Sequence, residues 1–223
     1  MSRRSAALRV VVCGTDTDVG KTVVSALLVQ GLNATYWKPV QSGLEDGGDR
    51  ERVMKLIDLP SDRWIAETYA FQAAVSPHWA AELEDTRLDP DRLTLPATGA
   101  RPLVVETAGG LHVPLTRTWQ QIDQLQRWML PVVLVARSGL GTLNHTLLSL
   151  EALRNRKIPV IGLILNGPAH ADNPRTLSEI GNVAVLAELP PLHPLNAEAL
   201  RNAWHNQELG PKFEAFANHL DNR

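Results

Sequence analysis

The sequence predicts a doubly wound α/β fold, in which a mostly parallel sheet carries helices on both faces. Short runs rich in Val, Ile and Leu recur along the 223-residue chain without the alternation of a half-exposed strand. Such runs are typical of parallel strands that are covered on both faces. Segments with helical spacing lie between them, and this alternation indicates an α/β sheet. We expect a single domain over residues 1–223.

The strands of this sheet are expected at the short apolar runs. Val and Ile favour strands because their branched side chains pack well on a pleated surface. The runs are residues 8–13, 103–105, 131–136 and 159–165, with a weaker run at 183–187 and a further candidate at 35–38.

The helices are expected where apolar residues recur every three or four positions. In residues 120–129, Ile122, Leu125 and Met129 form one stripe along a helix. The other helical candidates are residues 22–31, 144–154, 173–180 and 196–205. Residues 43–102 hold only short helical stretches near 49–58 and 76–85, and we interpret them as an excursion from the one domain.

Charge and cysteine content exclude several classes of protein. The chain has 22 Lys and Arg against 24 Asp and Glu, so it lacks the large basic surface expected of a nucleic-acid binder. Cys13 is the single cysteine, so no intrachain disulfide can form. No apolar run approaches the roughly 18 residues of a membrane span. We expect a soluble cytoplasmic protein with no nucleic-acid and no membrane partner.

The strongest functional signal is a glycine-rich loop between the first expected strand and the first expected helix. It reads Gly14-Thr-Asp-Thr-Asp-Val-Gly20-Lys21-Thr22. Backbone N–H groups of such a loop and of the following helix N-terminus bind phosphate oxygens. Lys21 is expected to reach the β- and γ-phosphates, and the Thr22 hydroxyl to bind Mg²⁺. The pattern indicates a P-loop NTPase type of fold.

Two details of this loop depart from common forms. Five residues rather than four separate Gly14 from Gly20, so Thr15 stands where the first glycine usually does. Switch ATPases of the ParA and MinD type carry a second lysine five residues before the GKT lysine, and this chain has Asp16 there. The alternative interpretation is a glycine turn at a strand–helix corner with Lys21 in solvent, but the order of strand, loop, GKT and helix argues against it.

Several motifs in consistent order resemble those of the dethiobiotin synthetase family. The loop GTDTDVGKT is followed by residues 37–43 (WKPVQSG), which resemble that family's lysine–proline element. Further matches are residues 76–78 (SPH), 106–110 (ETAGG), 113–115 (VPL), 139–145 (GLGTLNH), Asn166 and 188–190 (ELP). The resemblance runs from about residue 8 to residue 191.

The resemblance implies an ATP-dependent carbon–nitrogen cyclo-ligase of biotin biosynthesis. Enzymes of this family join CO₂ to 7,8-diaminopelargonic acid with MgATP and form dethiobiotin, ADP and phosphate. One amine forms a carbamate, the carbamate attacks the γ-phosphate, and the neighbouring amine closes the ring on the resulting anhydride. The resemblance also implies Mg²⁺ as cofactor, ATP as co-substrate, and a homodimer with the substrate site at its interface.

The catalytic residues implied by the resemblance are Lys38, Lys21 and Thr17. Phosphoryl transfer depends mainly on positioning and on charge neutralisation, so two lysines suit a reaction between an anionic carbamate and ATP. By resemblance Lys38 lies between the carbamate and the γ-phosphate, and Thr17 lies near the transferred group. Taken alone, Lys38 would be interpreted as a solvated residue at the end of an edge strand.

The metal ligands implied are the oxygen donors Thr22, Asp49 and Glu106. Glu106 ends the strand at 103–105, where phosphate-loop enzymes commonly place an acidic residue. Asp49 lies in an acidic stretch at 45–49, so a solvated run of charge is the alternative and its register is open. The seven His lack metal-ligand spacing, which argues against a zinc site.

The remaining predicted contacts divide between nucleotide and substrate. For ATP they are Thr15, Asp16, Asp18, Val19, Gly20, Lys21, Thr22, Val23, Asn166, Glu188, Leu189 and Pro190. For the diamine they are Ser42, Gly109, Gly141, Thr142, Leu143 and Asn144. By resemblance, residues 141–144 come from the other subunit, and their helix N-terminus is expected to bind the substrate carboxylate. Asn166 would equally suit a turn, and residues 141–144 would equally suit an ordinary capped helix start.

Two residues depart from the family pattern. Thr107 stands where the family usually has Gly, and a positive φ there would strain a β-branched residue and divert the loop. Arg137 replaces a smaller residue and is expected to alter the pocket rim or the dimer contact.

Two other functions compete with the synthetase hypothesis. A related amide-forming ligase, such as a cobyrinate-diamide synthase, would carry a glutaminase domain that 223 residues do not accommodate. A regulatory switch ATPase would carry the second loop lysine and a basic tail, which this sequence lacks.

Overall fold

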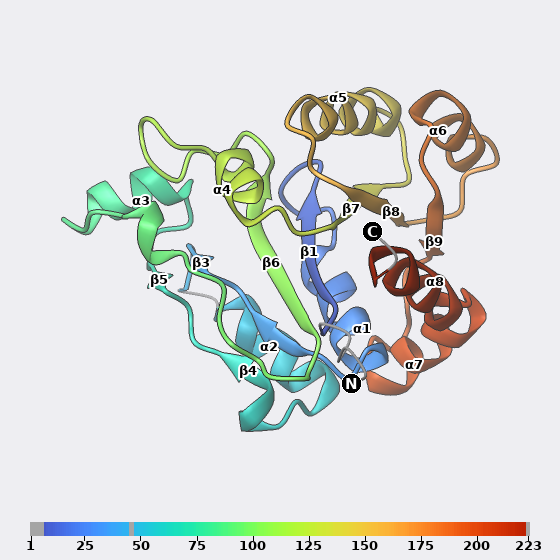
Figure 1. The fold of residues 1–223 in the computed structure, drawn as a ribbon, viewed down its shortest axis with the longest axis horizontal. Coiled ribbons are helices and arrows are strands. Elements are labelled where there is room, and N and C mark those ends of the chain that lie inside the picture. The colour runs from blue at the N-terminus through green and yellow to red at the C-terminus, as the bar shows by residue number, and fades with distance from the viewer. Residues whose placement is uncertain (1–6, 45–46, 222–223) are drawn as a thin grey trace.

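The centre of the fold is a parallel sheet in the order β4-β2-β6-β1-β7-β8-β9 (Figure 1). The structure, a computed structural model, describes residues 7–44 and 47–221. Every neighbouring pair in this sheet is parallel, which confirms the fold class predicted from the sequence. The strands are β1 (Arg9–Gly14), β2 (Thr35–Trp37), β4 (Trp64–Ile65), β6 (Leu103–Gly110), β7 (Val132–Arg137), β8 (Val160–Asn166) and β9 (Val185–Leu189).

Both faces of the sheet are covered by helices and buried in apolar contact. Along β1, Val11 and Cys13 pack into the cluster on one face, whereas Val10 and Val12 pack into the cluster on the other. This is why the strand shows no polar alternation in its sequence. The helices are α1 (Lys21–Gly31), α2 (Asp49–Ile57), α3 (Pro77–Leu83), α4 (Gln121–Trp128), α5 (Thr142–Asn155), α6 (Asn173–Gly181), α7 (Ala197–Asn206) and α8 (Leu209–Asp221).

The helices divide between the two faces as a doubly wound fold requires. Buried residues of α4, α5 and α6 belong to one apolar cluster, and those of α1, α2, α7 and α8 belong to the other. Figure 1 shows α5 and α6 above the sheet and α1, α7 and α8 below it. The predicted helices are all present, and their ends agree with the sequence pattern to within two residues.

The excursion between the second strand and β6 is less regular, as the sequence indicated. It contains α2, α3 and three two-residue strands that sequence periodicity did not predict: β3 (Val40–Gln41), β4 and β5 (Tyr69–Ala70). β3 pairs with β5 in a separate small sheet, while β4 extends the main sheet beside β2. Strands of two residues carry too few positions for a period to be visible, so they escape detection by pattern.

All strands of the main sheet end at the same edge, because the sheet is parallel. The glycine-rich loop follows β1, Lys38 follows β2, and Asn166 is the last residue of β8. β6 extends to Gly110, five residues beyond its predicted end, and carries Glu106 to this edge. Ligands bind at this edge of open α/β sheets, so the fold gathers the predicted site residues there.

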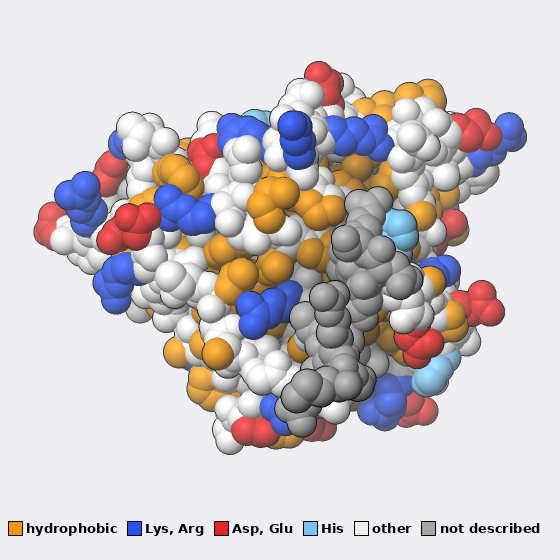
Figure 2. Space-filling view, viewed as in Figure 1, with side chains coloured by type: hydrophobic (Ala, Val, Ile, Leu, Met, Phe, Trp, Pro, Cys, Tyr) orange, Lys and Arg blue, Asp and Glu red, His pale blue; other side chains and the backbone are white. Residues whose placement is uncertain are grey.

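Neither a membrane-spanning helix nor a segregation of charge on the face drawn in Figure 2 is found among the described residues. No helix of the described residues is long and apolar enough to cross a membrane. On the face drawn in Figure 2, the basic and acidic side chains of the described residues are intermixed around the margin, with apolar side chains between them.

Candidate active site

The glycine-rich loop joins β1 to α1 and forms a turn that requires glycine. Gly20 adopts the left-handed conformation with φ 93° immediately before α1 begins. A Cβ atom at this position would lie 2.1 Å from Asn166 Nδ2, so a side chain here would be strained by the backbone conformation and would also displace Asn166. Lys21 Nζ donates to the carbonyl of Asp16 at 2.9 Å, which folds the lysine along the loop. The loop thus has the strand–loop–helix context predicted for phosphate binding.

A compact polar centre lies beside this loop. Thr22 Oγ1 donates to Asp49 Oδ1 at 2.9 Å and lies 3.0 Å from Glu106 Oε1. Lys38 Nζ is ion-paired with both carboxylates, at 3.1 Å from Glu106 Oε1. The centre therefore joins residues from the start of α1, from the segment after β2, from the start of α2 and from β6. Asp49 belongs to this centre and not to a solvated run of charge.

Burial makes these charges interdependent. Glu106 is fully buried and the Lys38 side chain is 5% exposed. Burial alone would lower the pKa of Lys38, but the adjacent Glu106 and Asp49 carboxylates raise it above its usual value. Burial would likewise raise the pKa of Asp49, yet Lys38 and the Thr22 hydroxyl bring it below its usual value. Lys38 therefore stays a cation and Asp49 a carboxylate at neutral pH.

Lys21 differs from Lys38 in that no carboxylate of the described residues 7–44 and 47–221 is ion-paired with it. Burial and the neighbouring positive charge of Lys38 lower the pKa of Lys21. An anion that binds between the two ammonium groups would relieve their mutual repulsion. The pair thus favours a ligand with closely spaced negative charges, such as a polyphosphate.

The oxygen atoms of Thr22, Asp49 and Glu106 have the chemistry of a Mg²⁺ site. Mg²⁺ prefers carboxylate, hydroxyl and water oxygens and is usually held by one or two protein carboxylates. Here one hydroxyl bonds to an oxygen of each carboxylate, so three oxygens lie close together. The described residues contain no group of three or more His, Cys, Asp or Glu suited to a metal, so the candidate set depends on the Thr22 hydroxyl beside two carboxylates.

One cavity of about 760 Å³ is lined by half of the predicted site residues. Its wall combines the loop, the polar centre, the segment after β3 and the end of β6. The predicted site residues that line it are Thr17, Asp18, Gly20, Lys21, Thr22, Val23, Lys38, Ser42, Asp49, Glu106 and Gly109. A ligand in this cavity would contact both lysines and the three oxygen donors at once.

The remaining nucleotide candidates lie at the neighbouring strand ends. Asn166 Nδ2 donates to the Val19 carbonyl at 3.2 Å, so this side chain touches the glycine-rich loop. Leu189 is the register partner of Asn166 on β9, which brings Glu188, Leu189 and Pro190 beside it. Thr15 and Asp16 line a second groove together with residues of α5, and Val19 is buried.

Comparison with known proteins identifies the family. The AAA domain family matches residues 8–199. The ATP-dependent dethiobiotin synthetase BioD of Afipia carboxidovorans is 50% identical over 196 residues, which cover 88% of this chain and 93% of that protein. The corresponding protein of Bradyrhizobium diazoefficiens is 49% identical over 205 residues, covering 92% of this chain and 97% of that protein. This chain belongs to the ATP-dependent dethiobiotin synthetase family.

Membership in the dethiobiotin synthetase family confirms the resemblance and the ligase class predicted from the motifs. Bordetella avium has a longer relative, the Biotin biosynthesis bifunctional protein BioCD. It is 54% identical over 199 residues, and the match covers 89% of this chain but 42% of that protein. The chain thus corresponds to less than half of the bifunctional protein.

Solved structures support the fold of this dethiobiotin synthetase family member. A ParA family ATPase from Chlorobium tepidum has a TM-score of 0.58 at 13% identity, covering 97% of this chain and 99% of that one. The cell division ATPase MinD from Pyrococcus furiosus has a TM-score of 0.56 at 13% identity, covering 93% and 99%. At this identity the likeness concerns the fold alone.

The predicted substrate loop of this family member lies away from the Lys38 cavity. Gly141 (φ 89°) precedes α5, and Thr142 is buried with its hydroxyl 3.3 Å from that of Thr146. Gly141, Thr142, Leu143 and Asn144 do not line the cavity that holds Lys38. Within one chain, these residues are therefore not brought to the polar centre.

The two departures from the family pattern are accommodated differently. Thr107 lies in β6 without a positive φ and places its hydroxyl 3.3 Å from the Val12 carbonyl, so the condition for strain is not met. The positive φ of this segment, 61°, falls on Gly109 instead. Arg137 bonds to Asp16 Oδ2 at 2.8 Å, and its side chain is 46% exposed. Its contact is with the phosphate loop, and an exposed pair of this kind contributes little stability.

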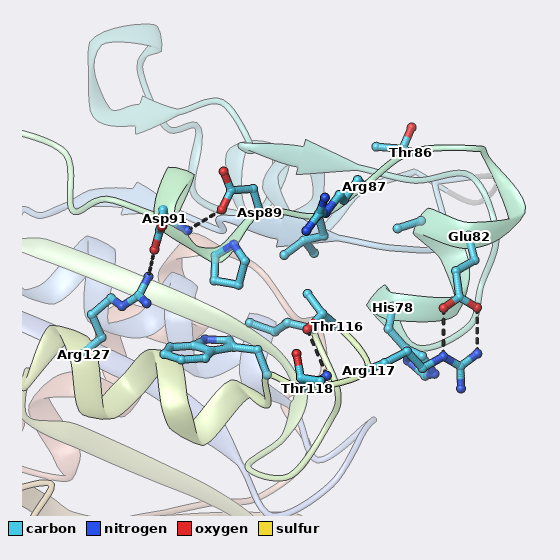
Figure 3. A pocket seen from close by; sticks show the side chains of 15 residues that line it. His78, Glu82, Thr86, Arg87, Asp89, Asp91, Thr116, Arg117, Thr118 and Arg127 are labelled. Atoms are coloured by element: carbon cyan, nitrogen blue, oxygen red, sulfur yellow. Dashed lines mark hydrogen bonds and ion pairs between the residues drawn. The ribbon is translucent and has the colours of Figure 1, made fainter.

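A third cavity, of about 840 Å³, contains none of the predicted site residues (Figure 3). Two ion pairs lie at opposite ends of it: Arg117 with Glu82 at 2.7 Å, and Arg127 with Asp91 at 2.7 Å. His78 of the SPH motif lines this cavity, whereas Ser76 and Pro77 line the cavity with Lys38. The short helix α3 thus contributes residues to both cavities, and the glycine-rich loop and both lysines line the other one.

Sequence reasoning missed two residues that support the polar centre. Gln41 Oε1 accepts from the Asp49 backbone N–H at 3.1 Å and so fixes the start of α2. Tyr36 is fully buried and donates its hydroxyl to Glu106 Oε2 at 3.0 Å. The usable signal was strand alternation, because Tyr36 lies two residues before Lys38 and therefore shares its face.

Proposed function

We propose that this chain catalyses the ATP-dependent ring closure of 7,8-diaminopelargonic acid with CO₂, giving dethiobiotin, ADP and phosphate. Family membership supports the reaction. The observation that carries the proposal is the convergence of Lys38 with Thr22, Asp49 and Glu106 beside Lys21 in one cavity. We further propose that residues 1–223 act as one domain.

Thr22, Asp49 and Glu106 would hold Mg²⁺. The ion would supply positive charge to the β- and γ-phosphate oxygens, which lowers the repulsion that an anionic nucleophile meets at the γ-phosphorus. Glu106 is fixed by burial within β6 and Asp49 by its place at the start of α2. This chain thus presents the two carboxylates on rigid elements and not on long loops.

Lys21 and Lys38 would bring the two anionic reactants together. In the proposed sequence, CO₂ adds to one amine of the diamine, which loses a proton and becomes a carbamate. A carbamate oxygen then bonds to the γ-phosphorus as the bond to ADP breaks. The second amine attacks the carbonyl carbon of the mixed anhydride and loses a proton, the C–O bond to phosphate breaks, and the cyclic urea forms. Lys38 would neutralise charge on the carbamate and the transferred phosphoryl group, with Thr17 beside it.

The nucleotide would lie across the glycine-rich loop and the ends of β8 and β9. Backbone N–H groups of residues 15–23 would bind the phosphates, while Asn166 and residues 188–190 would contact the base. Support comes from the Asn166 contact with the Val19 carbonyl, which ties the base region to the phosphate loop.

A second copy of the chain would complete the substrate site. Residues 141–144 lie at a helix N-terminus, where free N–H groups and the helix dipole favour a carboxylate. Leu140 is fully exposed and Leu148 is 57% exposed, and Leu148 lines an apolar groove that also includes Thr15 and Asp16 of the phosphate loop. We propose that this face pairs with its copy and that residues 141–144 of one subunit serve the cavity of the other.

The expected cellular setting is the cytoplasm. Cys13 is buried in β1, and burial raises the pKa of its thiol to about 12, which keeps it in the unreactive thiol form. A protein without disulfides suits a reducing compartment.

The test is phosphate release from MgATP with 7,8-diaminopelargonic acid and bicarbonate, combined with mass detection of the product. We expect phosphate release to require both compounds and the product to have the mass of a cyclic urea. ATP binding without that product would retain the phosphate loop but overturn the substrate assignment. Dimerisation that required ATP would favour the competing switch function, for which the fold of the ParA and MinD structures is the only support.

A further inference from the structure

The buried Glu106 carboxylate has its two oxygens held by different partners. Oε1 accepts from Lys38 Nζ and lies within hydrogen-bond distance of the Thr22 hydroxyl. Oε2 accepts from the Tyr36 hydroxyl at 3.0 Å. Among the residues that the structure describes, Tyr36 is the only side chain recorded as donating to Oε2. The two sides of the carboxylate are therefore distinguished by their donors.

The register of the sheet explains why Tyr36 reaches this carboxylate. Tyr36 on β2 is paired with Val104 on β6, and Glu106 is two residues further along the same strand. Side chains two residues apart point to one face of a sheet, so Val104 and Glu106 share the face that Tyr36 occupies. Tyr36 and Glu106 are both fully buried, so their hydrogen bond is shielded from bulk water.

We propose that Tyr36 is a positioning residue for the metal site. Its hydroxyl holds Oε2 of Glu106, so that Oε1 faces Thr22 and Asp49 and the carboxylate keeps one orientation. This inference rests on the proposed function only in taking Glu106 as a metal ligand. Without the hydroxyl, the carboxylate would rotate toward other donors, and metal binding would require its reorientation.

The test compares two variants that each remove one buried tyrosine hydroxyl. Tyr36→Phe removes the donor to Glu106, whereas Tyr69→Phe removes a hydroxyl that accepts from the Asp89 backbone N–H at 2.9 Å, outside the polar centre. Both rings are buried, and phenylalanine keeps the volume of each. The probe is Mn²⁺ alone, with free Mn²⁺ measured by electron paramagnetic resonance on the full chain.

We expect Tyr36→Phe to raise the Mn²⁺ dissociation constant roughly tenfold, the size of effect typical when a partner of a metal ligand is removed. Tyr69→Phe should leave it within about twofold of the unmodified chain. The Mg²⁺ concentration for half-maximal phosphate release should rise in parallel for Tyr36→Phe, whereas ADP binding in EDTA should not change. In a Glu106→Gln background, Tyr36→Phe should have no further effect on Mn²⁺ binding.

Unchanged Mn²⁺ affinity in Tyr36→Phe, or an equal loss in both variants, would overturn the inference. If Tyr36→Phe did not fold, Tyr36→His would take its place, since it removes the hydroxyl but offers a ring N–H donor. That variant should retain Mn²⁺ binding better than Glu106→Gln, and equal loss would contradict the positioning role. Because Mn²⁺ binding is measured without substrate, absence of dethiobiotin would refute the proposed function and leave this result standing.

Discussion

Replacement of Lys38 by methionine is the most informative perturbation of the polar centre. Methionine keeps the apolar stem of a side chain that is 5% exposed and removes the ammonium group, which is paired with Asp49 and Glu106. Removal of one partner from a buried ion pair lowers the free energy of unfolding by about 3–5 kcal/mol, because the remaining charge stays buried without compensation. For a chain of this size each kcal/mol lowers Tm by roughly 2–4 °C, so a fall of about 6–20 °C is expected.

The same variant separates ATP binding from turnover. Lys21 and the backbone of the glycine-rich loop remain in Lys38→Met, so MgATP affinity should change by less than about threefold. Turnover should fall by about 10³-fold, the loss typical when a group that stabilises developing charge is removed. Addition of MgADP should raise the Tm of Lys38→Met by more than that of the unmodified chain, since Mg²⁺ would neutralise the two carboxylates that Lys38→Met leaves unpaired.

The assays are calorimetric titration of MgATP, phosphate release with the diamine and bicarbonate, and a thermal melt. Lys212→Ala is the matched control, because Lys212 Nζ donates to the carbonyls of Leu186 and Gln207 at 2.7 Å, far along the chain from the polar centre. It should lower Tm and leave turnover unchanged. An equal loss of MgATP binding and turnover in Lys38→Met would refute the assigned role, because Lys38 would then act in nucleotide binding.

Three further predictions follow from the same geometry. Glu106→Gln should raise the Mg²⁺ concentration required for half-maximal turnover by about 10–100-fold; an unchanged Mg²⁺ titration would remove Glu106 from the metal ligands. Gly20→Ala should lower the free energy of unfolding by about 1–3 kcal/mol and weaken MgADP binding, because φ is 93° and Asn166 Nδ2 lies where the Cβ would be. A melt and a titration that match those of the unmodified chain would contradict this. The lowered pKa of Asp49 implies stability that is present above the usual carboxyl pKa of about 3.9 and is lost as the pH falls through the folded value. The free energy of unfolding, measured with urea, should therefore fall less between pH 7 and pH 3 in Asp49→Asn than in the unmodified chain. An equal fall in both would show that Asp49 is not the group involved.

Local sequence patterns predicted the elements that are determined by residues close together in the chain. The glycine-rich loop is recognisable because strand, glycines, lysine and helix are neighbours in the chain, and Gly20 does adopt the left-handed conformation. The strands with apolar residues on both faces were equally evident. The end of β6 was not, because Glu106 and Thr107 are polar residues inside a strand, and their burial depends on contacts with β1 and β2.

The polar centre is formed by contacts between distant residues that local sequence patterns do not predict. Residues 49 and 106 are 57 positions apart, and only the pairing of β2 with β6 and the return of α2 bring both carboxylates to Lys38. Sequence alone left Asp49 between a metal ligand and a solvated charge, since an acidic stretch looks the same in both cases. Family resemblance favoured the first, and the structure places Asp49 against Thr22 and Lys38.

The sequence by itself determined the class of fold, the phosphate loop and the family, because each is written in contiguous residues or in motifs that keep their order. The tertiary structure alone decided that Tyr36 supports Glu106, that Arg137 meets the phosphate loop, and that residues 141–144 stay away from the Lys38 cavity of their own chain. These contacts depend on strand register and on the packing of separate elements. Register and packing determine whether a donor and an acceptor come within the roughly 3 Å of a hydrogen bond. A one-residue shift in register would turn each side chain to the other face of the sheet.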